Sequence, residues 1–287
     1  MPDAPLVQVR DLRRTYTRPR TSLLGPVPVV EALRGVSFDI ARGERFGIVG
    51  ESGSGKSTLL RLLCGLDRAT SGSIRFDGQE VVGRRERDLA FLRAELQIVF
   101  QDPTGSLDPR MRVRDIVCEP LVVQGHPDPR GRLRELLDAV GLPADAADRY
   151  PHQFSGGQRQ RISIARALAP SPSVLVADEP VSALDVSVRA QILNLLEDLV
   201  EDNGLTLVFV SHDLSVVRHV CDTVAVMHRG EIVETGRVDD VHERPSHPYT
   251  QRFIAAVPTL RGALAGVTAA QLASGPAAGA RSAGGPA

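Results

Sequence analysis

The stretch that decides the fold is GESGSGKST, residues 50–58. A short apolar run, residues 46–49, precedes it, and residues 57–66 carry leucines at 59, 62, 63 and 66, the spacing of a buried helical stripe. The pattern therefore predicts a strand, a glycine-rich loop and a helix in direct succession. Lys56 in this loop is the only lysine of the 287-residue chain, although lysine and arginine together number 34.

Residues 50–57 match the pattern GxxxxGK[ST] in the strand-to-helix context that this pattern requires. Glycines let backbone N–H groups surround a phosphate, and the helix N-terminus adds positive potential. A slim ammonium can reach between β- and γ-phosphates where a planar guanidinium would not fit, which explains a lone lysine among arginines. The competing interpretation is a glycine-rich turn with an accidental lysine. The nucleotide-binding candidates are Gly50, Glu51, Ser52, Gly53, Ser54, Gly55, Lys56, Ser57 and Thr58.

A second candidate element is VLVADE, residues 174–179, which reads as a buried strand that ends in two acids. A phosphate-binding loop needs a carboxylate at the end of a neighbouring strand to hold Mg²⁺, and Asp178 stands there. The adjacent Glu179 could orient and deprotonate an attacking water. The alternative is a solvated acid pair at a strand end.

The rest of the chain alternates between strand and helix patterns. Residues 191–200 carry an apolar helical stripe closed by Gly204, and residues 205–210 form a third apolar strand that ends at Ser211 and His212. Asp77 and Gly78 suit the tight turn of a hairpin over residues 73–81. This order predicts an α/β fold with a mainly parallel sheet. Prolines punctuate a helical pattern over about residues 112–169, which predicts a separate helical subdomain.

Composition sets limits on the function. A hydrophobic content of 42% supports one large domain, or one domain with a small appendage, and the net charge of −1 with interleaved arginines and acids indicates no basic face for nucleic acid. Cys64, Cys118 and Cys221 lie far apart, so we expect reduced thiols packed as small apolar groups. No apolar run approaches the roughly 18 residues of a membrane span, and the start lacks a secretory signal.

Residues 154–159, FSGGQR, resemble the LSGGQ signature of ABC-type ATPases, with Phe154 in place of leucine; a plain flexible loop is the alternative. Further motifs of that family follow in its order. Gln101 resembles the Q-loop glutamine, and SALD, residues 182–185, resembles the D-loop. His212 resembles the switch histidine, and Tyr16 resembles the aromatic residue that stacks on adenine.

The resemblance implies a P-loop NTPase fold with an antiparallel β subdomain and an α-helical subdomain beside the core sheet. It also implies that one chain cannot complete its ATP sites, because the signature closes over the nucleotide of a second subunit in a head-to-tail dimer. The residues that would face the partner's nucleotide are Ser155, Gly156, Gly157, Gln158 and Asp185. The implied catalytic residues are Glu179, His212 and Gln101, and the implied Mg²⁺ ligands are Ser57, Gln101 and Asp178.

Residues 97–110 and 244–250 are similar to the oligopeptide and dipeptide ATP-binding subunits of the peptide and nickel branch of bacterial ABC importers. This implies ATP and Mg²⁺ as cofactors, and as partners a second ABC ATPase subunit, two transmembrane permease subunits and, through the complex, an extracellular substrate-binding protein. The location would be peripheral, on the cytoplasmic face of the cell membrane. Residues 103–114 would receive a coupling helix of the membrane subunit, unless they form only a solvated loop. No cysteine follows Cys221, so we expect no iron–sulfur cluster.

The expected organisation is a nucleotide-binding domain over residues 1–240, a short C-terminal extension over 241–261 and a disordered Ala/Gly-rich tail over 262–287. Other functions stay open at this stage. The chain could be a weakly hydrolytic partner that mainly clamps nucleotide, or it could serve import of nickel or another small solute. A soluble ABC ATPase that acts on DNA or ribosomes is a third possibility, which the short helical subdomain and the absence of a second cassette or a basic arm disfavour. Glu179, His212 and the intact SGGQ favour an active ATPase.

Overall fold

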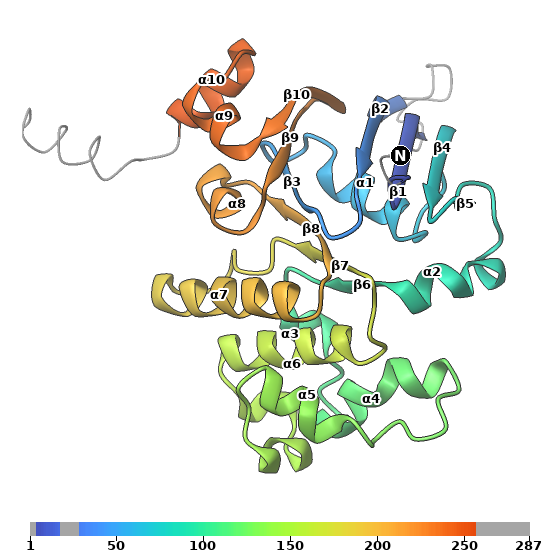
Figure 1. Cartoon of the computed structure of the whole chain (residues 1–287), viewed down its shortest axis with the longest axis vertical. Helices are drawn as coiled ribbons and strands as arrows, with labels where there is room; N and C mark the ends of the chain where they lie inside the picture. Colours follow the sequence, from blue (N-terminus) through green and yellow to red (C-terminus); the bar gives the residue numbers. More distant parts are fainter. Residues whose placement is uncertain (1–3, 18–28, 257–287) are drawn as a thin grey trace, which may run out of the picture.

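A computed structural model describes residues 4–17 and 29–256 of the chain and contains two sheets (Figure 1). The larger, six-stranded sheet has the strand order β10 (Glu231–Arg237), β9 (Thr223–His228), β3 (Arg45–Val49), β8 (Thr206–Ser211), β7 (Val174–Asp178) and β6 (Leu96–Val99). Every pairing from β9 to β6 is parallel, and only β10 runs antiparallel to its neighbour. The prediction of an α/β fold with a mainly parallel sheet is confirmed.

Both faces of this sheet are buried, which explains why its strands read as continuous apolar runs. In β8, Leu207 and Phe209 join one hydrophobic cluster while Val208 and Val210 join the other. The leucines of α1 (Lys56–Leu63) pack in the second cluster, together with the smaller sheet. Helices α6 (Gly156–Leu168), α7 (Val186–Asp202) and α8 (Leu214–Val220) contribute to the first cluster. The sheet therefore separates two cores.

The smaller sheet is antiparallel, with the order β2 (Val29–Ile40), β1 (Val7–Thr17), β4 (Ser71–Phe76) and β5 (Gln79–Glu80). Asp77 and Gly78 connect β4 to β5 with φ of 46° and 74°, so the predicted hairpin and its turn residues are confirmed. The pairing of β1 with β2 contains several register shifts. These irregularities interrupt the alternation of apolar and polar residues that would have revealed the two strands in the sequence.

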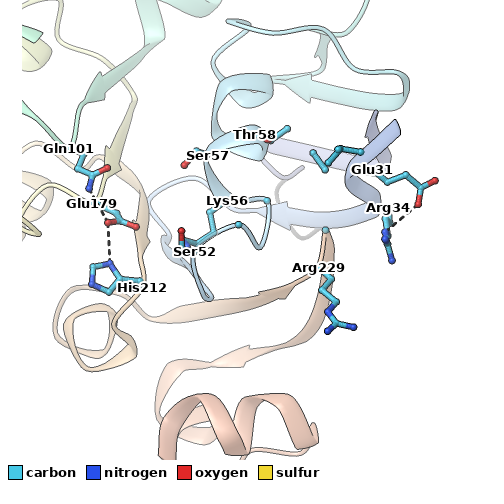
Figure 2. A pocket seen from close by; sticks show the side chains of 15 residues that line it. Glu31, Arg34, Ser52, Lys56, Ser57, Thr58, Gln101, Glu179, His212 and Arg229 are labelled. Carbon is cyan, nitrogen blue, oxygen red and sulfur yellow. Dashed lines mark hydrogen bonds and ion pairs between the residues drawn. The ribbon is translucent and has the colours of Figure 1, made fainter. Parts of the chain in front are cut away.

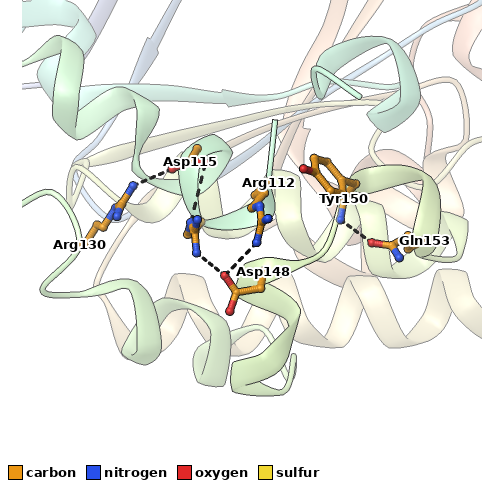
Figure 3. A network of polar contacts seen from close by, with 7 residues as sticks. Arg112, Asp115, Arg130, Asp148, Tyr150 and Gln153 are labelled. Carbon is orange, nitrogen blue, oxygen red and sulfur yellow. Dashed lines mark hydrogen bonds and ion pairs between the residues drawn. The ribbon is translucent and has the colours of Figure 1, made fainter. Parts of the chain in front are cut away.

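The helical region lies at the lower end of the molecule in Figure 1. Its elements are α3 (Pro103–Ser106), α4 (Val113–Val123), α5 (Leu133–Ala139), the short 3₁₀ helices η2 (Ala144–Asp148) and η3 (Pro151–Gln153), and α6. The 3₁₀ helix η1 (Glu86–Leu89) and α2 (Ala90–Glu95) precede β6 and pack in the second cluster. Figure 3 shows how the start of α4 is tied to the segment before α6: Arg112 and Arg114 both contact Asp148, and Arg130 bonds Asp115 at 2.9 Å. The backbone N–H of Val113 donates to Arg149 at 3.0 Å.

Two further helices, α9 (Val238–Glu243) and α10 (Pro248–Ala255), follow β10. All three cysteines are free and buried, as predicted, and burial raises the pKa of Cys64 to about 12. Across residues 4–17 and 29–256, no helix combines the length and the apolar character needed to span a membrane. The tail predicted to be disordered, residues 262–287, lies outside the described residues.

Candidate nucleotide-binding and catalytic site

The central cleft has a volume of about 660 Å³ and lies over the loop of residues 50–58 and the ends of neighbouring strands (Figure 2). Among the predicted site residues that line it are Ser52, Gly53, Gly55, Lys56, Ser57, Thr58, Gln101, Glu179 and His212. These residues come from segments far apart in the sequence. They converge because the carboxyl ends of parallel strands β3, β6, β7 and β8 meet at one edge of the sheet.

The loop conformation depends on its glycines. Gly50, Gly53 and Gly55 have φ of 155°, 79° and 110°. A Cβ on Gly50 would lie 2.3 Å from the carbonyl oxygen of Met227, and one on Gly55 would lie 2.7 Å from that of Ala32. Larger residues would therefore displace the loop from the β9 and β2 backbones. With no acidic residue in the first turn of α1, the helix N-terminus keeps its positive potential for an anion.

The side chain of Lys56 is buried beneath this loop, with 6% of the residue exposed. Its ammonium donates to the carbonyl oxygens of Gly50 at 2.7 Å and Glu51 at 3.1 Å. Burial lowers the pKa of Lys56, and the nearby charges of Glu179 and Asp178 act in the opposite direction. The cation is thus held against backbone carbonyls, and a bound anion would offset its cost of burial.

Two acids stand at the end of β7. Burial raises the pKa of Asp178, the charge of Glu179 adds to this effect, and Lys56 and Arg61 oppose it. No hydrogen bond within the described part of the chain engages the Asp178 carboxylate. The half-buried Asp178 carboxylate and the hydroxyl of Ser57, which lines the cleft, are hard oxygen donors of the kind that Mg²⁺ prefers. Mg²⁺ keeps several waters and needs few protein ligands.

The carboxylate of Glu179 lies between two polar side chains. Its Oε2 accepts from Gln101 Nε2 at 3.3 Å and lies 3.1 Å from His212 Nδ1, contacts that Figure 2 marks with dashed lines. Glu179 has φ of 45°, an unfavourable backbone conformation for a residue with a side chain. The backbone after β7 is therefore strained where it presents this carboxylate to the cleft.

The predicted signature residues lie elsewhere, at the start of α6. Ser155 Oγ accepts from Gln158 N–H at 3.3 Å, and Gln158 Oε1 accepts from Ser155 N–H at 3.0 Å. This reciprocal pair caps α6. Gly157 lies so close to Val188 that a Cβ on it would come within 2.4 Å of Val188 Cγ1, whereas one on Gly156 would meet only Leu184 Cδ2 at 3.5 Å.

Asp185 is the N-cap residue of α7, beside the signature. Of the described residues, the ones that line the central cleft include neither Asp185 nor any of residues 155–158. Phe154 is 5% exposed and lies under the Arg149 guanidinium, 4.2 Å from its ring centroid. Phenylalanine at this position packs into the protein.

A family model described as "ABC transporter" matches residues 33–182, more than half of the chain. The chain belongs to the ABC transporter family. Its curated relatives include the oligopeptide transport ATP-binding protein OppF of Streptococcus mutans, 47% identical over 257 residues that cover 88% of this chain and 82% of OppF. The dipeptide transport ATP-binding protein DppF of Escherichia coli is 48% identical, over 89% of this chain and 77% of DppF.

Solved structures of ABC proteins have the same fold. One is a dimeric structure of a post-hydrolysis state of the ATP-binding cassette MJ0796 bound to ADP and Pi, with a TM-score of 0.70 and 32% identity over 81% of this chain and 98% of that one. Another is cbiO1 from Clostridium perfringens, part of the ABC transporter complex cbiONQ, with a TM-score of 0.73 and 29% identity over 92% and 100%.

In this ABC family member, Tyr16 is not among the described residues that line the cleft. Its hydroxyl donates to Asp67 Oδ2 at 2.6 Å, and the Arg14 guanidinium lies 4.3 Å from its ring centroid. Tyr16 pairs with Val30 on β2, and Val30 does line the cleft. The assignment of Tyr16 to adenine stacking stays a prediction.

The cleft also contains charged residues that the sequence patterns missed. Arg34 on β2 and Arg229 between β9 and β10 both line it (Figure 2). Backbone bonds connect these segments to the loop, from Arg34 N–H to Gly230 at 2.8 Å and from Gly230 N–H to Ser54 at 2.8 Å. A glycine after Arg229 predicts a turn but does not indicate which part of the molecule that turn contacts.

Proposed function

We propose that this ABC family member is the ATP-hydrolysing subunit of an importer that couples ATP binding and hydrolysis to the uptake of di- or oligopeptides. The observation that carries the proposal is the convergence of Lys56 and the Gln101–Glu179–His212 cluster on one cleft of nucleotide size. The peptide substrate class rests on relatives that are 47–48% identical and carry peptide-transport names. The cofactors of this function are ATP and Mg²⁺.

The phosphate-binding loop would hold the nucleotide in the following way. Those backbone N–H groups of the loop that point into the cleft would surround the phosphates, and the Lys56 ammonium would reach their outer oxygens. Ser57, Asp178 and Gln101 would hold Mg²⁺, which supplies charge neutralisation for the developing negative charge. Tyr16 offers a ring to adenine, and with Arg14 on one face the base would stack on the other.

Glu179 is the proposed general base for the attacking water. Gln101 and His212 fix the orientation of its carboxylate through the contacts at 3.3 and 3.1 Å. A carboxylate held in this way can accept the proton of a water as the water attacks the γ-phosphorus. His212 and Gln101 would also sense the γ-phosphate and the attacking water.

The site needs a second subunit, identical or different, that supplies the signature. Ser155 to Gln158 and Asp185 would lie over the nucleotide of the partner, and the nucleotide of this chain would be covered by the partner's equivalent residues. The placement of residues 155–158 outside the cleft supports this division. A dimeric state of a solved relative with 32% identity supports it as well.

The remaining assignments concern the transporter as a whole. Residues 103–114, which contain α3 and follow Gln101, are the proposed surface for a coupling helix of the membrane subunit, in a transporter with two transmembrane permease subunits. Through them the chain would serve an extracellular substrate-binding protein, from a peripheral position on the cytoplasmic face of the membrane. We propose no role in nucleic-acid binding.

Purification of the tagged chain from detergent-solubilised membranes tests the whole proposal. We expect copurification of membrane subunits and, after reconstitution with a binding protein, ATPase activity that rises with added peptide and stops when EDTA removes Mg²⁺. The Glu179→Gln variant in the same complex is the control for contaminating ATPases. Copurification with ribosomes or DNA-bound proteins, without membrane subunits, would contradict an import function.

A further inference from the structure

Tyr249, in the C-terminal segment RPSHPYT of residues 244–250, contacts the phosphate-binding loop although it lies 198 positions after Glu51. The backbone N–H of Glu51 donates a hydrogen bond to the hydroxyl oxygen of Tyr249 at 3.2 Å. Tyr249 lies in the first turn of α10 and is 4% exposed. Its hydroxyl therefore provides a direct contact between α10 and the loop that precedes α1.

The position of this hydroxyl is determined by packing around the ring. His228, the last residue of β9, stacks on Tyr249 with 3.9 Å between ring centroids, and Phe253 stacks at 5.9 Å. The turn before α10 is held by Glu234, whose carboxylate accepts from Ser246 N–H at 2.8 Å and from His247 N–H at 3.1 Å. Burial raises the pKa of Tyr249, so the hydroxyl stays neutral at physiological pH.

The Gly50–Glu51 peptide is bonded at both of its edges. Its carbonyl oxygen, on Gly50, accepts from Lys56 Nζ at 2.7 Å, and its N–H, on Glu51, donates to Tyr249. The C=O and N–H of a trans peptide point in opposite directions. Lys56 thus holds the peptide from one side and Tyr249 holds it from the other.

Nucleotide binding changes the demands on Lys56. An ammonium has three donors, and two of them serve Gly50 and Glu51 carbonyl oxygens. Contact with both a β- and a γ-phosphate oxygen requires two donors, so at least one carbonyl must lose its bond. The bond to Tyr249 lies on the opposite edge of the peptide and does not compete with phosphate.

We infer that Tyr249 is a positioning residue that holds the Gly50–Glu51 peptide of the phosphate-binding loop in place when Lys56 turns to the nucleotide. The inference rests on the proposed ATPase function. It assigns a role in that reaction to the C-terminal extension. Tyr249 itself touches neither the nucleotide nor the attacking water; it acts on them through the loop backbone.

The Tyr249→Phe variant tests this role because it keeps the ring between His228 and Phe253 and removes only the hydroxyl. We expect the KM for ATP and the Kd of a fluorescent ATP analogue to rise about three- to tenfold, the effect of one lost hydrogen bond, while kcat stays within about twofold. A loss confined to KM indicates weaker ground-state binding by the loop. A purely structural role would lower the Tm without this split.

Tyr150→Phe is the matched control, because it removes a tyrosine hydroxyl from the helical region and leaves the loop untouched. We expect its KM, Kd and kcat to equal those of the parent chain.

The Lys56→Ala variant distinguishes failure of the role of Tyr249 from failure of the proposed ATP site. If Lys56→Ala loses nucleotide binding but Tyr249→Phe binds as tightly as the parent, the role of Tyr249 is refuted and the ATP site stands. If Lys56→Ala also binds normally, both are refuted.

Amide hydrogen exchange at Glu51 tests the hydrogen bond without any substitution. The Glu51 amide of the parent chain should exchange at least about tenfold more slowly than an unprotected amide, both with and without Mg-ATP. Tyr249→Phe should remove this protection, and Tyr150→Phe should retain it. Rapid exchange at Glu51 in the folded parent with Mg-ATP would overturn the inference even if the variants could not be purified.

Discussion

The loop of residues 50–58 and the signature of residues 155–158 are both motifs of ATP sites, yet their surroundings in this chain differ. The loop lies in a cleft with Glu179, Gln101 and His212, and the helix that follows it packs in one of the two hydrophobic cores. The signature begins a helix that packs in the other core, on the opposite face of the six-stranded sheet (Figure 1). Leu184 and Val188 of the following segment lie close to its two glycines.

This difference indicates which motif residues a single chain places in one cleft and which it leaves outside that cleft. The strand ends bring Lys56, Glu179, Gln101 and His212 to one cleft within a single subunit. The hydroxyl of Ser155 is used to cap its own helix and does not reach that cleft. In the proposed mechanism these two motifs are half-sites for different nucleotides, and the variants below separate them.

Lys56→Ala should have the largest effect, because it removes the loop's cation from both the bound nucleotide and the transition state. We expect kcat/KM for ATP to fall by about 10⁴-fold, from charge-assisted hydrogen bonds lost in binding and in catalysis. Steady-state ATPase assays and titration with a fluorescent nucleotide measure the two parts. Lys56→Arg is the control for shape, because it retains the positive charge but replaces the slim ammonium by a planar guanidinium. The buried ammonium is fitted to the carbonyl oxygens of Gly50 and Glu51, so we expect Lys56→Arg to lose ATPase activity as well. Turnover close to the parent rate in Lys56→Ala would remove the loop from the mechanism.

Glu179→Gln should have the next largest effect, through kcat alone. The amide keeps the size of the side chain and its contact with His212 but cannot accept the proton of the attacking water, so we expect kcat to fall by about 10³-fold. Nucleotide affinity should stay within a few-fold of the parent value. Size-exclusion chromatography with ATP should then show a dimer that persists. A variant that still hydrolyses ATP at the parent rate would place the base elsewhere.

Much of the cleft could be predicted because its residues lie at the ends of strands that are visible in the sequence. The apolar runs before Gly50, Asp178 and Ser211 correspond to β3, β7 and β8, and parallel strands bring their carboxyl ends to one edge. The predicted helix over residues 191–200 is longer in the structure, Val186–Asp202. The apolar stripe marks only the part that faces the core, whereas the first turn, after Asp185, is largely solvated.

Other features left no local signal. The strands β1 and β2 carry many charged residues and irregular register, so the antiparallel sheet followed from the family resemblance and not from alternation. The contact of Tyr249 with Glu51 joins positions 198 residues apart. Nothing in the local sequence around Tyr249, beyond the preceding proline, indicates this contact. Tyr16 is an aromatic residue of the expected kind, but its hydrogen bond to Asp67 and the position of the Arg14 guanidinium over its ring depend on tertiary packing.

Gly156→Asp tests the signature half-site with little disturbance of the fold. A Cβ at Gly156 makes only an ordinary contact with Leu184, and an acid in the first turn suits a helix N-terminus. The new carboxylate would repel the partner's γ-phosphate, so we expect turnover to fall about 10- to 100-fold while nucleotide binding by the single chain stays within about twofold. An ATPase assay beside a nucleotide titration distinguishes these two outcomes.

A mixture of Gly156→Asp and Lys56→Ala chains sharpens the same comparison. In a mixed dimer, Lys56 of one chain and the signature of the other form one intact site. Random pairing of equal amounts should therefore restore up to about a quarter of the parent turnover. If the mixture stays as inactive as its components although crosslinking shows mixed dimers, the two motifs do not act across a shared interface.

Asp148→Ala should have the smallest effect and tests whether the ionic network of Figure 3 positions the signature. Asp148 contacts Arg112 and Arg114 and lies a few residues before Ser155, but its side chain is 62% exposed. Exposed ion pairs contribute about 0–1 kcal/mol, so we expect the Tm to fall by no more than about 3 °C and both KM and kcat to stay within about twofold. The matched control is Asp145→Ala, which removes a carboxylate from the same short helix. Among the described residues, Asp145 forms no ion pair.

A tenfold loss of kcat in Asp148→Ala alone, with KM unchanged, would instead mean that these arginines align the signature with the partner's nucleotide. The two half-sites would then also differ in the structure that positions them. Strand ends of a buried sheet position the residues of the cleft, whereas a solvent-exposed ionic network would position the signature.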